Sequence, residues 1–257
     1  VAMFFGIGLL HLNEVAVGLG HRAIWPLCSE LRKRGFWMIN IAIDGPSGAG
    51  KSTLSRKAAA ALGFLYIDTG ALYRTVGLAA VRAGIAPTDT QSIAKLPASI
   101  TVSLQSAADG QHVFLNGEDV TALIRTEQVS AYASVVSAVP QIRAFLLDTQ
   151  RQLAADNNVV MDGRDIGTVV LPHAQLKIFL TASAEDRARR RFEELQARGE
   201  PAVFETVYRD LVERDRRDSE RAAAPLVQSP DAVLLDTTGN SFEESLSLLL
   251  KTIKERI

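Results

Sequence analysis

Short apolar runs alternate with longer stretches of helical periodicity along most of the chain. The apolar runs predict strands at Ile39–Ile43, Phe64–Ile67, Val159–Met161, Leu176–Leu180 and Ala232–Leu235. The stretches between and after them predict helices at Lys51–Leu62, Ala71–Ala83, Gln141–Asp156 and Phe242–Ile257. Strands that alternate with helices in this way are typical of an α/β fold with a mostly parallel central sheet.

The segment Ile100–Ile124 interrupts this alternation. It contains two β-like runs, with turn signals at Ala108-Asp109-Gly110 and at Asn116-Gly117. Asn-Gly is a strong hairpin signal because both residues tolerate a positive φ. The segment therefore predicts a small antiparallel insertion between the second and third strands of the main sheet.

Length and charge narrow the class of protein. A chain of 257 residues can form one large domain, or one domain with an insertion. Its 28 Lys and Arg nearly balance its 29 Asp and Glu, so we expect no nucleic-acid partner. No apolar run approaches the roughly 18 residues of a spanning helix, so we expect no membrane partner. Nothing in the pattern requires more than a monomer.

The first 37 residues differ in composition from the rest of the chain. They contain both tryptophans and Cys28, the single cysteine of the chain, while "MINIAIDG" from Met38 leads directly into the first predicted strand. A lone cysteine allows no intrachain disulfide and fits a reducing, cytoplasmic location. We expect residues 1–37 to be an upstream extension without a catalytic role; the alternative is an ordinary N-terminal helix that packs on the domain.

A complete phosphate-binding motif lies between the first predicted strand and the first predicted helix. The pattern G-x-x-x-x-G-K-[ST] is formed by Gly45, Pro46, Ser47, Gly48, Ala49, Gly50, Lys51 and Ser52, with Thr53 directly after it. Glycines let backbone N–H groups converge on phosphate, and the helix N-terminus adds its positive dipole end. Lys51 can reach the β- and γ-phosphate oxygens, and the Ser52 hydroxyl can bind Mg²⁺. The alternative, a chance glycine-rich turn, does not account for the strand and helix on either side, so we expect a triphosphate site.

This motif occurs in kinases, GTPases and motor ATPases. The chain lacks the guanine-reading N-K-x-D pattern, which argues against a GTPase. Its short length and many arginines favour a small-molecule kinase, which must neutralise two facing phosphate groups and exclude water. Two alternatives stay open: a kinase for another small acceptor, such as UMP, AMP or a hydroxy acid, and a regulatory protein that binds ATP without transferring phosphate.

Further charged clusters suggest an acceptor site. Asp68 and Thr69 follow the second predicted strand, at the edge where ligands gather in open α/β sheets, and Arg74 lies five residues further on in the next helix. The third predicted strand is followed by Asp162, Arg164 and Asp165. Three charges beside a buried strand form either part of a polar cleft or a structural ion-pair cluster.

Two arginine-rich segments, "EDRARRRFEELQARGE" and "YRDLVERDRRDSER", have helical periodicity. The first places Arg187, Arg190 and Arg191 on one face, as a lid over ATP phosphates would require. The second places Arg214, Asp218 and Arg221 at i, i+4 and i+7, also on one face. Both could equally be solvated faces with surface salt bridges.

The motifs "IAIDGPSGAGKST", "DTGALYR", "GEDVTALIRT", "MDGRDIGTVV", "KIFLTAS" and "ERDRRDSERAAAPL" together resemble bacterial-type cytidylate kinases. The likeness runs from about Met38 to the C-terminus. It implies an α/β P-loop kinase fold of three layers, with an antiparallel insertion in the monophosphate-binding region and a helical lid. The implied domain covers residues 38–257, with a core at 38–70 and 157–257, the insertion at about 71–156 and the lid at about 184–204.

The resemblance also implies roles for individual residues. Ser134, Arg143 and Asp165 would surround the base; Arg74, Arg164 and Arg221 would hold the monophosphate; and Thr69, Arg214 and Asp218 would meet the sugar. Threonine at 69 departs from the serine of the family pattern, which leaves the choice between ribose and deoxyribose open. The residues implied to be catalytic are Lys51, Arg164, Arg190 and Asp162, where Asp162 either faces the metal or partners an arginine.

The reaction implied is the transfer of a phosphoryl group from ATP, with Mg²⁺, to CMP and dCMP. The attacking group is already an anionic phosphate oxygen, so no strong general base is needed. Catalysis would come from in-line positioning and charge neutralisation. A lid that closes only when both nucleotides are bound would prevent hydrolysis of ATP.

Overall fold

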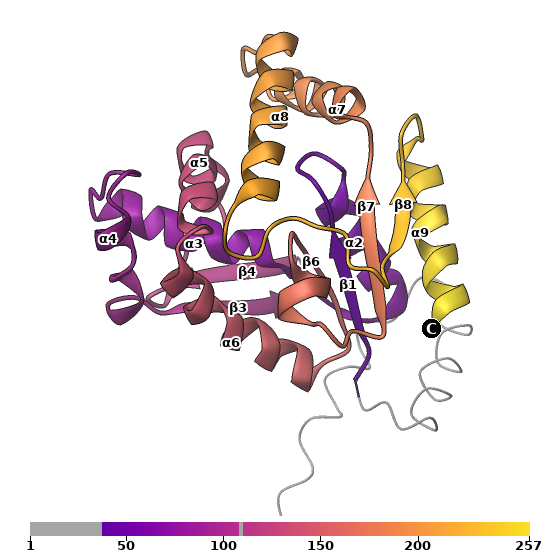
Figure 1. Cartoon of the computed structure of the whole chain (residues 1–257), viewed down its shortest axis with the longest axis horizontal. Coiled ribbons are helices and arrows are strands. Elements are labelled where there is room, and N and C mark those ends of the chain that lie inside the picture. The colour runs from indigo at the N-terminus through magenta and orange to yellow at the C-terminus, as the bar shows by residue number, and fades with distance from the viewer. Residues whose placement is uncertain (1–37, 108–109) are drawn as a thin grey trace, which may run out of the picture.

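The computed structural model of the chain describes residues 38–107 and 110–257 (Figure 1). The prediction for residues 1–37 and the first predicted turn of the insertion, at Ala108 and Asp109, lie outside the described residues.

A parallel sheet of five strands forms the centre of the molecule, in the order β2-β6-β1-β7-β8. The strands are β1 (Asn40–Asp44), β2 (Leu65–Asp68), β6 (Val159–Gly163), β7 (Leu176–Thr181) and β8 (Val233–Asp236). Each of the five predicted strands is confirmed, with shifts of one or two residues at the ends. Most residues of the central strands are apolar because helices cover both faces of a parallel sheet.

Successive residues of the strands point to opposite faces and so build two separate cores. Ile41 and Ile43 of β1 pack with α2 (Lys51–Leu62) and α9 (Phe242–Arg256). Ala42, between them, packs on the other face with α6 (Pro140–Asp156) and with η3 (Ile166–Val170), a short π-helix. The result is the predicted three-layer arrangement, with two helical layers around the sheet.

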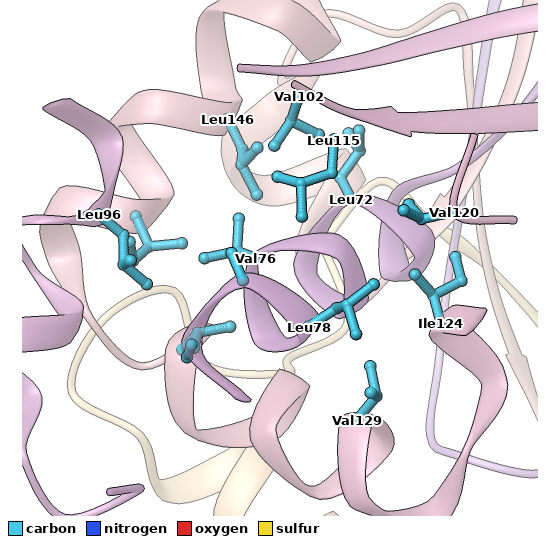
Figure 2. Close-up of a cluster of buried hydrophobic side chains, with 14 of the residues drawn as sticks. Leu72, Val76, Leu78, Leu96, Val102, Leu115, Val120, Ile124, Val129 and Leu146 are labelled. Atoms are coloured by element: carbon cyan, nitrogen blue, oxygen red, sulfur yellow. The ribbon is translucent and has the colours of Figure 1, made fainter. Parts of the chain in front are cut away.

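The antiparallel insertion is confirmed as a three-stranded sheet, β3 (Val102–Ala107), β4 (Gly110–Leu115) and β5 (Glu118–Asp119). Asn116 and Gly117 both have positive φ angles, 51° and 84°, as a type I′ hairpin turn requires. In the apolar core beneath the insertion, Leu72 and Val76 lie among side chains from the strands and from α6 (Figure 2).

The helices of this region are α3 (Thr69–Arg82), α4 (Thr90–Ile93), η1 (Leu96–Ala98), η2 (Leu123–Arg125) and α5 (Glu127–Val136). Of these, only α3 was predicted from the sequence, and the longest of the unpredicted helices is α5. It packs closely against α3, where Gly77 leaves room for the α5 backbone: a Cβ at Gly77 would lie 3.2 Å from the Ala133 amide nitrogen.

The two arginine-rich segments form α7 (Ala184–Ala197) and α8 (Phe204–Glu220). They lie beyond the carboxyl ends of the strands, above the loop that links β1 to α2 (Figure 1). This position over the ligand-binding edge of the sheet agrees with the predicted helical lid.

Within the part of the chain that the structure describes, no single helix is long and apolar enough to cross a membrane. The helices α5 and α6 reach that length and composition only as a pair, which bends by 98° at the break between them.

Candidate active site

A cavity of about 670 Å³ opens at the carboxyl ends of the parallel strands. Its walls come from the β1–α2 loop, the ends of β2 and β6, the helices α3, α5, α7 and α8, and the loop before α9. Segments far apart in the sequence therefore meet around one space, as a shared donor and acceptor site requires.

The β1–α2 loop forms one end of the cavity. Gly45 has a φ of 149°, and a Cβ there would lie 1.9 Å from the carbonyl oxygen of Leu180, so this position admits only glycine. Helix α2 begins at Lys51 with Gly50 as its N-cap, and no side chain caps it. Its first backbone N–H groups are therefore available to an anion.

Lys51 lies buried beneath this loop. Its ammonium group donates to the carbonyl oxygen of Pro46 at 2.5 Å. Burial, and secondly the positive charge of Arg164, holds the pKa of Lys51 well below its usual value. An anion in the cavity would oppose both effects, because it would compensate the ammonium charge.

Asp162, at the end of β6, is surrounded by hydroxyl groups. Its two carboxylate oxygens accept from Ser52 at 2.9 Å and from Tyr66 at 2.8 Å, and its backbone carbonyl accepts from Thr69 at 2.8 Å. Burial, reinforced by the nearby charge of Asp68, raises the pKa of Asp162 to about 6. Among the described residues, the hydrogen-bond partners of this carboxylate are hydroxyls and not an arginine, which leaves it suited to a cation.

The pair Ser52 and Asp162 offers oxygen ligands of the kind that Mg²⁺ prefers. The described residues contain no cluster of three or more His, Cys, Asp or Glu side chains that could hold a metal ion by themselves. Mg²⁺ in phosphotransferases usually keeps several waters and binds through one or two protein oxygens and the substrate phosphates. The residues present fit that mode of binding.

Two arginines of the cavity carry unsatisfied donors. The Nε atoms of Arg74 and Arg214 are buried and have no hydrogen-bond partner in the described structure. Burial and the charge of Arg164 lower the pKa of Arg214 to about 10. A buried donor without a partner is costly, on the order of 1–3 kcal/mol. These two guanidinium groups therefore mark where an anionic ligand would be stabilised.

Two ion-pair groups order the remaining arginines. Arg164 donates to Asp218 at 2.8 Å, while Asp165 pairs with Arg143 and lies 3.4 Å from Arg221. Burial raises the pKa of Asp165, although both of its arginines oppose that effect. For Asp218 burial acts in the same direction, but the charge and hydrogen bond of Arg164, together with the charges of Arg214 and Arg221, outweigh it and the pKa is lowered.

The family model for cytidylate kinase matches residues 41–255, almost the whole of the described chain. The chain belongs to the cytidylate kinase family. A cytidylate kinase from Geobacter sp. (strain M21) is 47% identical over 229 residues, which cover 89% of this chain and 97% of the relative. The cytidylate kinase of Desulfitobacterium hafniense (strain Y51) is 48% identical, with 85% and 94% covered, and that of Pelotomaculum thermopropionicum is 50% identical, with 83% and 95% covered. The chain is therefore a kinase, a phosphotransferase with the P-loop fold.

The cavity of this kinase is lined by most of the residues that the sequence singled out. From the donor side these are Ser47, Gly48, Gly50, Lys51, Ser52, Thr53, Arg190 and Arg191. From the acceptor side they are Thr69, Arg74, Ser134, Asp162, Arg164, Asp165, Arg214, Asp218 and Arg221. Gly45, Pro46 and Ala49 belong to the same loop but do not line the cavity.

Arg143 does not line the cavity either. It reaches Asp165 from α6, and its guanidinium carbon lies 5.7 Å from the centre of the Tyr73 ring. Asp165 therefore lies between Arg143 and the cavity.

The structure does not bring Arg187 to the cavity together with Arg190 and Arg191. Arg187 is buried and donates to the carbonyl oxygens of Ser47 and Ala182, each at 2.9 Å, and to Asp215 at 2.6 Å. Asp215 in turn accepts from the Ser47 amide at 3.3 Å. In the described state, this pair of side chains holds the tip of the phosphate-binding loop against α7 and α8.

Arg190 and Arg191 lie at the cavity wall with different partners. Arg190 donates to the carbonyl oxygens of Thr237 at 2.9 Å and Asn240 at 3.4 Å, while Arg191 pairs with Glu194 at 2.9 Å. Arg190 thereby connects the lid to the loop before α9.

Sequence reasoning missed several residues of this site. Tyr66 and Tyr73 lie in stretches that read as ordinary strand and helix, and Asp215 is hidden in a charge-rich helix. Asn240 and Ser241 of the loop before α9, and Phe242 at the start of α9, line the cavity but belong to no nucleotide-binding motif. For Asp215 a signal existed, because it adjoins Arg214, but spacing alone could not show which face of α8 would meet the loop.

Proposed function

We propose that this kinase transfers the γ-phosphoryl group of ATP to CMP and dCMP, and so forms CDP and dCDP. The observation that carries the proposal is the pair of buried, unpartnered Nε atoms of Arg74 and Arg214, in the same cavity as Lys51. A second anion beside the P-loop phosphates would satisfy them. The curated relatives are themselves named cytidylate kinases, which supports a nucleoside monophosphate as this anion.

On the donor side, the P-loop amides and Lys51 would bind the ATP phosphates, and Arg190 and Arg191 would approach them from the lid. Ser52 and Asp162 would hold Mg²⁺, whose contribution when bound is to neutralise charge on the phosphate oxygens. Arg187 stays a proposed lid residue as well. In the described state, however, its donors are engaged by Ser47, Ala182 and Asp215, so it would need to move to meet ATP.

On the acceptor side, Arg74, Arg164 and Arg221 would bind the monophosphate. Cytosine presents an exocyclic amine that donates, beside ring atoms that accept. Asp165 would accept from the amine, while Arg143 and Ser134 would complete the recognition of the base. Uracil would place a carbonyl oxygen opposite Asp165, which leaves two acceptors facing each other and costs on the order of 1–3 kcal/mol for each unsatisfied group.

The sugar would lie near Thr69, Arg214 and Asp218. The Thr69 hydroxyl already donates to the Asp162 carbonyl, so toward a ligand it can only accept. A ribose 2′-OH can donate to it and a deoxyribose cannot. The methyl group that distinguishes threonine from serine also narrows the space around the sugar, so Thr69 is the residue we expect to set the ratio of CMP to dCMP.

Catalysis would then rest on charge and position. The acceptor phosphate oxygen attacks the γ-phosphorus in line, the bond to the β-phosphate oxygen breaks, and ADP leaves. Lys51, Arg164 and Arg190 neutralise the negative charge around the transferred group. No residue needs to remove a proton from the nucleophile.

We assign the core to residues 38–70 and 157–257, the monophosphate-binding part to about 71–156 and the lid to about 184–204. All residues proposed to bind either nucleotide come from one chain. A monomer would therefore suffice for the reaction. We also propose that it acts in the cytoplasm on small nucleotides, with neither nucleic acid nor a membrane as a partner.

A substrate panel tests this function. ADP release from ATP and Mg²⁺ is measured with CMP, dCMP, UMP and AMP side by side, with Lys51→Ala as the inactive control. We expect rapid release with CMP and dCMP, and slower release with UMP and AMP. Lys51→Ala should lose phosphoryl transfer by about three orders of magnitude while it still binds CMP. A preference for AMP or UMP would redirect the assignment to another acceptor, and ATP binding with no acceptor-dependent ADP release would indicate a regulatory protein.

A further inference from the structure

Asp44 connects two parts of the site that lie far apart in the sequence. It is the last residue of β1 and directly precedes Gly45, the first residue of the phosphate-binding loop. Its two carboxylate oxygens accept from the amides of Ile166 and Gly167, each at 2.7 Å. The side chain is buried and is not part of the cavity wall. Asp44 therefore cannot act by touching a ligand.

The two amides begin the short π-helix η3, which follows Arg164 and Asp165 without a break. A π-helix is rare, usually extends over a single turn and is frequent at functional sites. Asp44 supports η3 at its N-terminal end. At the other end, Arg151 of α6 donates to the carbonyl oxygens of Val170 at 3.1 Å and Val169 at 3.0 Å.

The two ends of η3 differ in what they hold in place. The end at Arg151 is followed by Leu171 and leads away from the cavity. The end at Asp44 directly follows Asp165, the carboxylate that pairs with Arg143 and Arg221. Because Ile166 is bonded covalently to Asp165, a fixed Ile166 amide fixes the backbone from which the Asp165 side chain projects.

The contact at Asp44 is also close. A Cβ at Gly167 would lie 3.4 Å from Asp44 and 3.1 Å from the Lys177 side chain, so the backbone of η3 packs tightly against β1 and β7 here. The two amides and the charge of Lys51 lower the pKa of Asp44, while the charge of Asp165 raises it. Burial outweighs them and raises the pKa of Asp44 to about 6. Both oxygens of this buried side chain are engaged by the amides of η3, which offsets part of the cost of its burial.

We propose that Asp44 is a positioning residue for acceptor recognition: through Ile166 and Gly167 it holds Asp165 and Arg164 in place relative to the phosphate-binding loop. The inference rests on the proposed function, since it takes Asp165 and Arg164 to meet the acceptor nucleotide. It adds that the end of β1 positions both the phosphate-binding loop and the segment that carries Arg164 and Asp165.

Asp44→Asn tests the proposal with little change in shape. The amide oxygen can accept from one backbone N–H, but the NH₂ group faces the other N–H, donor against donor. We expect the Kd for CMP, measured by calorimetry without ATP, to rise about tenfold, while the KM for ATP changes less than threefold. Arg151→Gln is the matched control, because it releases the other end of η3 and should leave the CMP affinity within twofold of the wild type.

Thermal unfolding of both variants separates positioning from stability. If Asp44→Asn and Arg151→Gln lower the Tm similarly and neither changes CMP affinity, Asp44 is only a structural group and the inference is wrong. It is also wrong if the KM for ATP rises as much as the Kd for CMP. Should Asp44→Asn not fold, Asp44→Ser keeps one oxygen acceptor and is measured against the same two criteria.

The wild type distinguishes failure of the inference from failure of the proposed function. A wild-type protein that neither binds nor phosphorylates CMP overturns the proposed function, and this inference with it. A wild type that phosphorylates CMP, beside an Asp44→Asn variant of unchanged CMP affinity, overturns the inference alone.

Discussion

The guanidinium Nε of Arg164 donates to a carboxylate oxygen of Asp218 at 2.8 Å, and this bond joins the segment after β6 to helix α8. Asp218 is buried, and Arg164 is only 20% exposed. The same Arg164 also donates to the carbonyl oxygen of Gly163 at 3.3 Å. One arginine proposed to bind phosphate is thus held from two sides before any ligand enters.

Removal of the charge at Asp218 should therefore weaken acceptor binding more than donor binding. In Asp218→Asn, Arg164 loses its charged partner and samples more orientations, so the monophosphate must order it on binding. We expect the KM for CMP to rise about 10- to 100-fold, with a smaller change in the KM for ATP. Steady-state kinetics with each substrate varied in turn would measure both.

Asp210→Asn is the matched control on the same helix. Asp210 is exposed, and its ion-pair partner among the described residues is Arg209 at 3.8 Å, so its replacement should leave both KM values within twofold of the wild type. An unchanged KM for CMP in Asp218→Asn would show that Arg164 needs no help from α8.

Arg187 offers a test of the lid. It is buried, and three hydrogen bonds tie it to the phosphate-binding loop, to Ala182 and to Asp215. Loss of one partner of a buried ion pair typically costs about 3–5 kcal/mol. We expect Arg187→Ala to lower the free energy of unfolding by a few kcal/mol, measured by urea denaturation without nucleotide, and to raise the KM for ATP.

Arg189→Ala is the control for this change. Arg189 lies on the same helix but is exposed, and within the described part of the chain it pairs with Glu185, so its loss should cost at most ~0.5 kcal/mol. If Arg187→Ala keeps the stability of the wild type and loses only activity, then Arg187 contributes to ATP binding and not to the loop.

The main architecture could be predicted because its determinants are local. In Ile39–Ile43 the isoleucines lie on one face and Ala42 on the other, a pattern expected of a strand that helices cover on both sides. The glycine after Leu62 marks a helix end that α2 confirms. Helix α5 was not predicted because polar and apolar residues are mixed in Glu127–Val136. Its formation depends on packing against α3 at Gly77.

The site could be predicted as a set of segments but not as a set of contacts. Helical spacing correctly places Arg187 and Arg191 one turn apart on α7, yet it cannot tell which of them the phosphate-binding loop will bury. Asp44 looks like one more polar residue before a glycine, because its partners Ile166 and Gly167 are more than a hundred residues away. Such pairs are decided by tertiary packing, which a single sequence does not display.

The pKa of Asp162 predicts a pH dependence of stability. Its value is about 6 in the folded protein and 3.8 in the reference state, so ionisation of Asp162 costs the folded state free energy. The contribution of the protonated side chain to the stability of the folded protein is complete below about pH 4 and is lost as the pH rises through about 6. Asp162→Asn lacks this loss. The variant should gain stability over the wild type between pH 4 and 7, by on the order of 2–3 kcal/mol.

Denaturant unfolding at several pH values would measure this gain. Asp236→Asn serves as a control of opposite sign, because the Thr238 hydroxyl and amide lower the pKa of Asp236. Its carboxylate stabilises the folded state near neutral pH, and that contribution fades as the pH falls below about 4. A stability difference for Asp162→Asn that does not vary with pH would mean that Asp162 ionises as easily in the folded protein as in the unfolded one.

Asp165 is the residue that we propose to select the base. Asp165 holds Arg143 and lies 3.4 Å from Arg221, so Asp165→Asn changes the proposed base contact and also frees two buried cations. Catalytic efficiency should therefore fall for every acceptor. The proposed contact with the cytosine amine predicts something more specific, because an asparagine amide can donate to the uracil carbonyl as well as accept from cytosine.

The ratio of kcat/KM for CMP to that for UMP should accordingly fall about 10- to 100-fold in Asp165→Asn, as expected for one lost discriminating group. Asp156 is exposed and accepts a hydrogen bond from Gln152 at 2.8 Å, so Asp156→Asn should keep the wild-type ratio. If Asp165→Asn lowers both efficiencies equally, then Asp165 orders Arg143 and Arg221 without reading the base. Discrimination would then have to come from Ser134 and Arg143, because they are the remaining residues proposed to meet the cytosine.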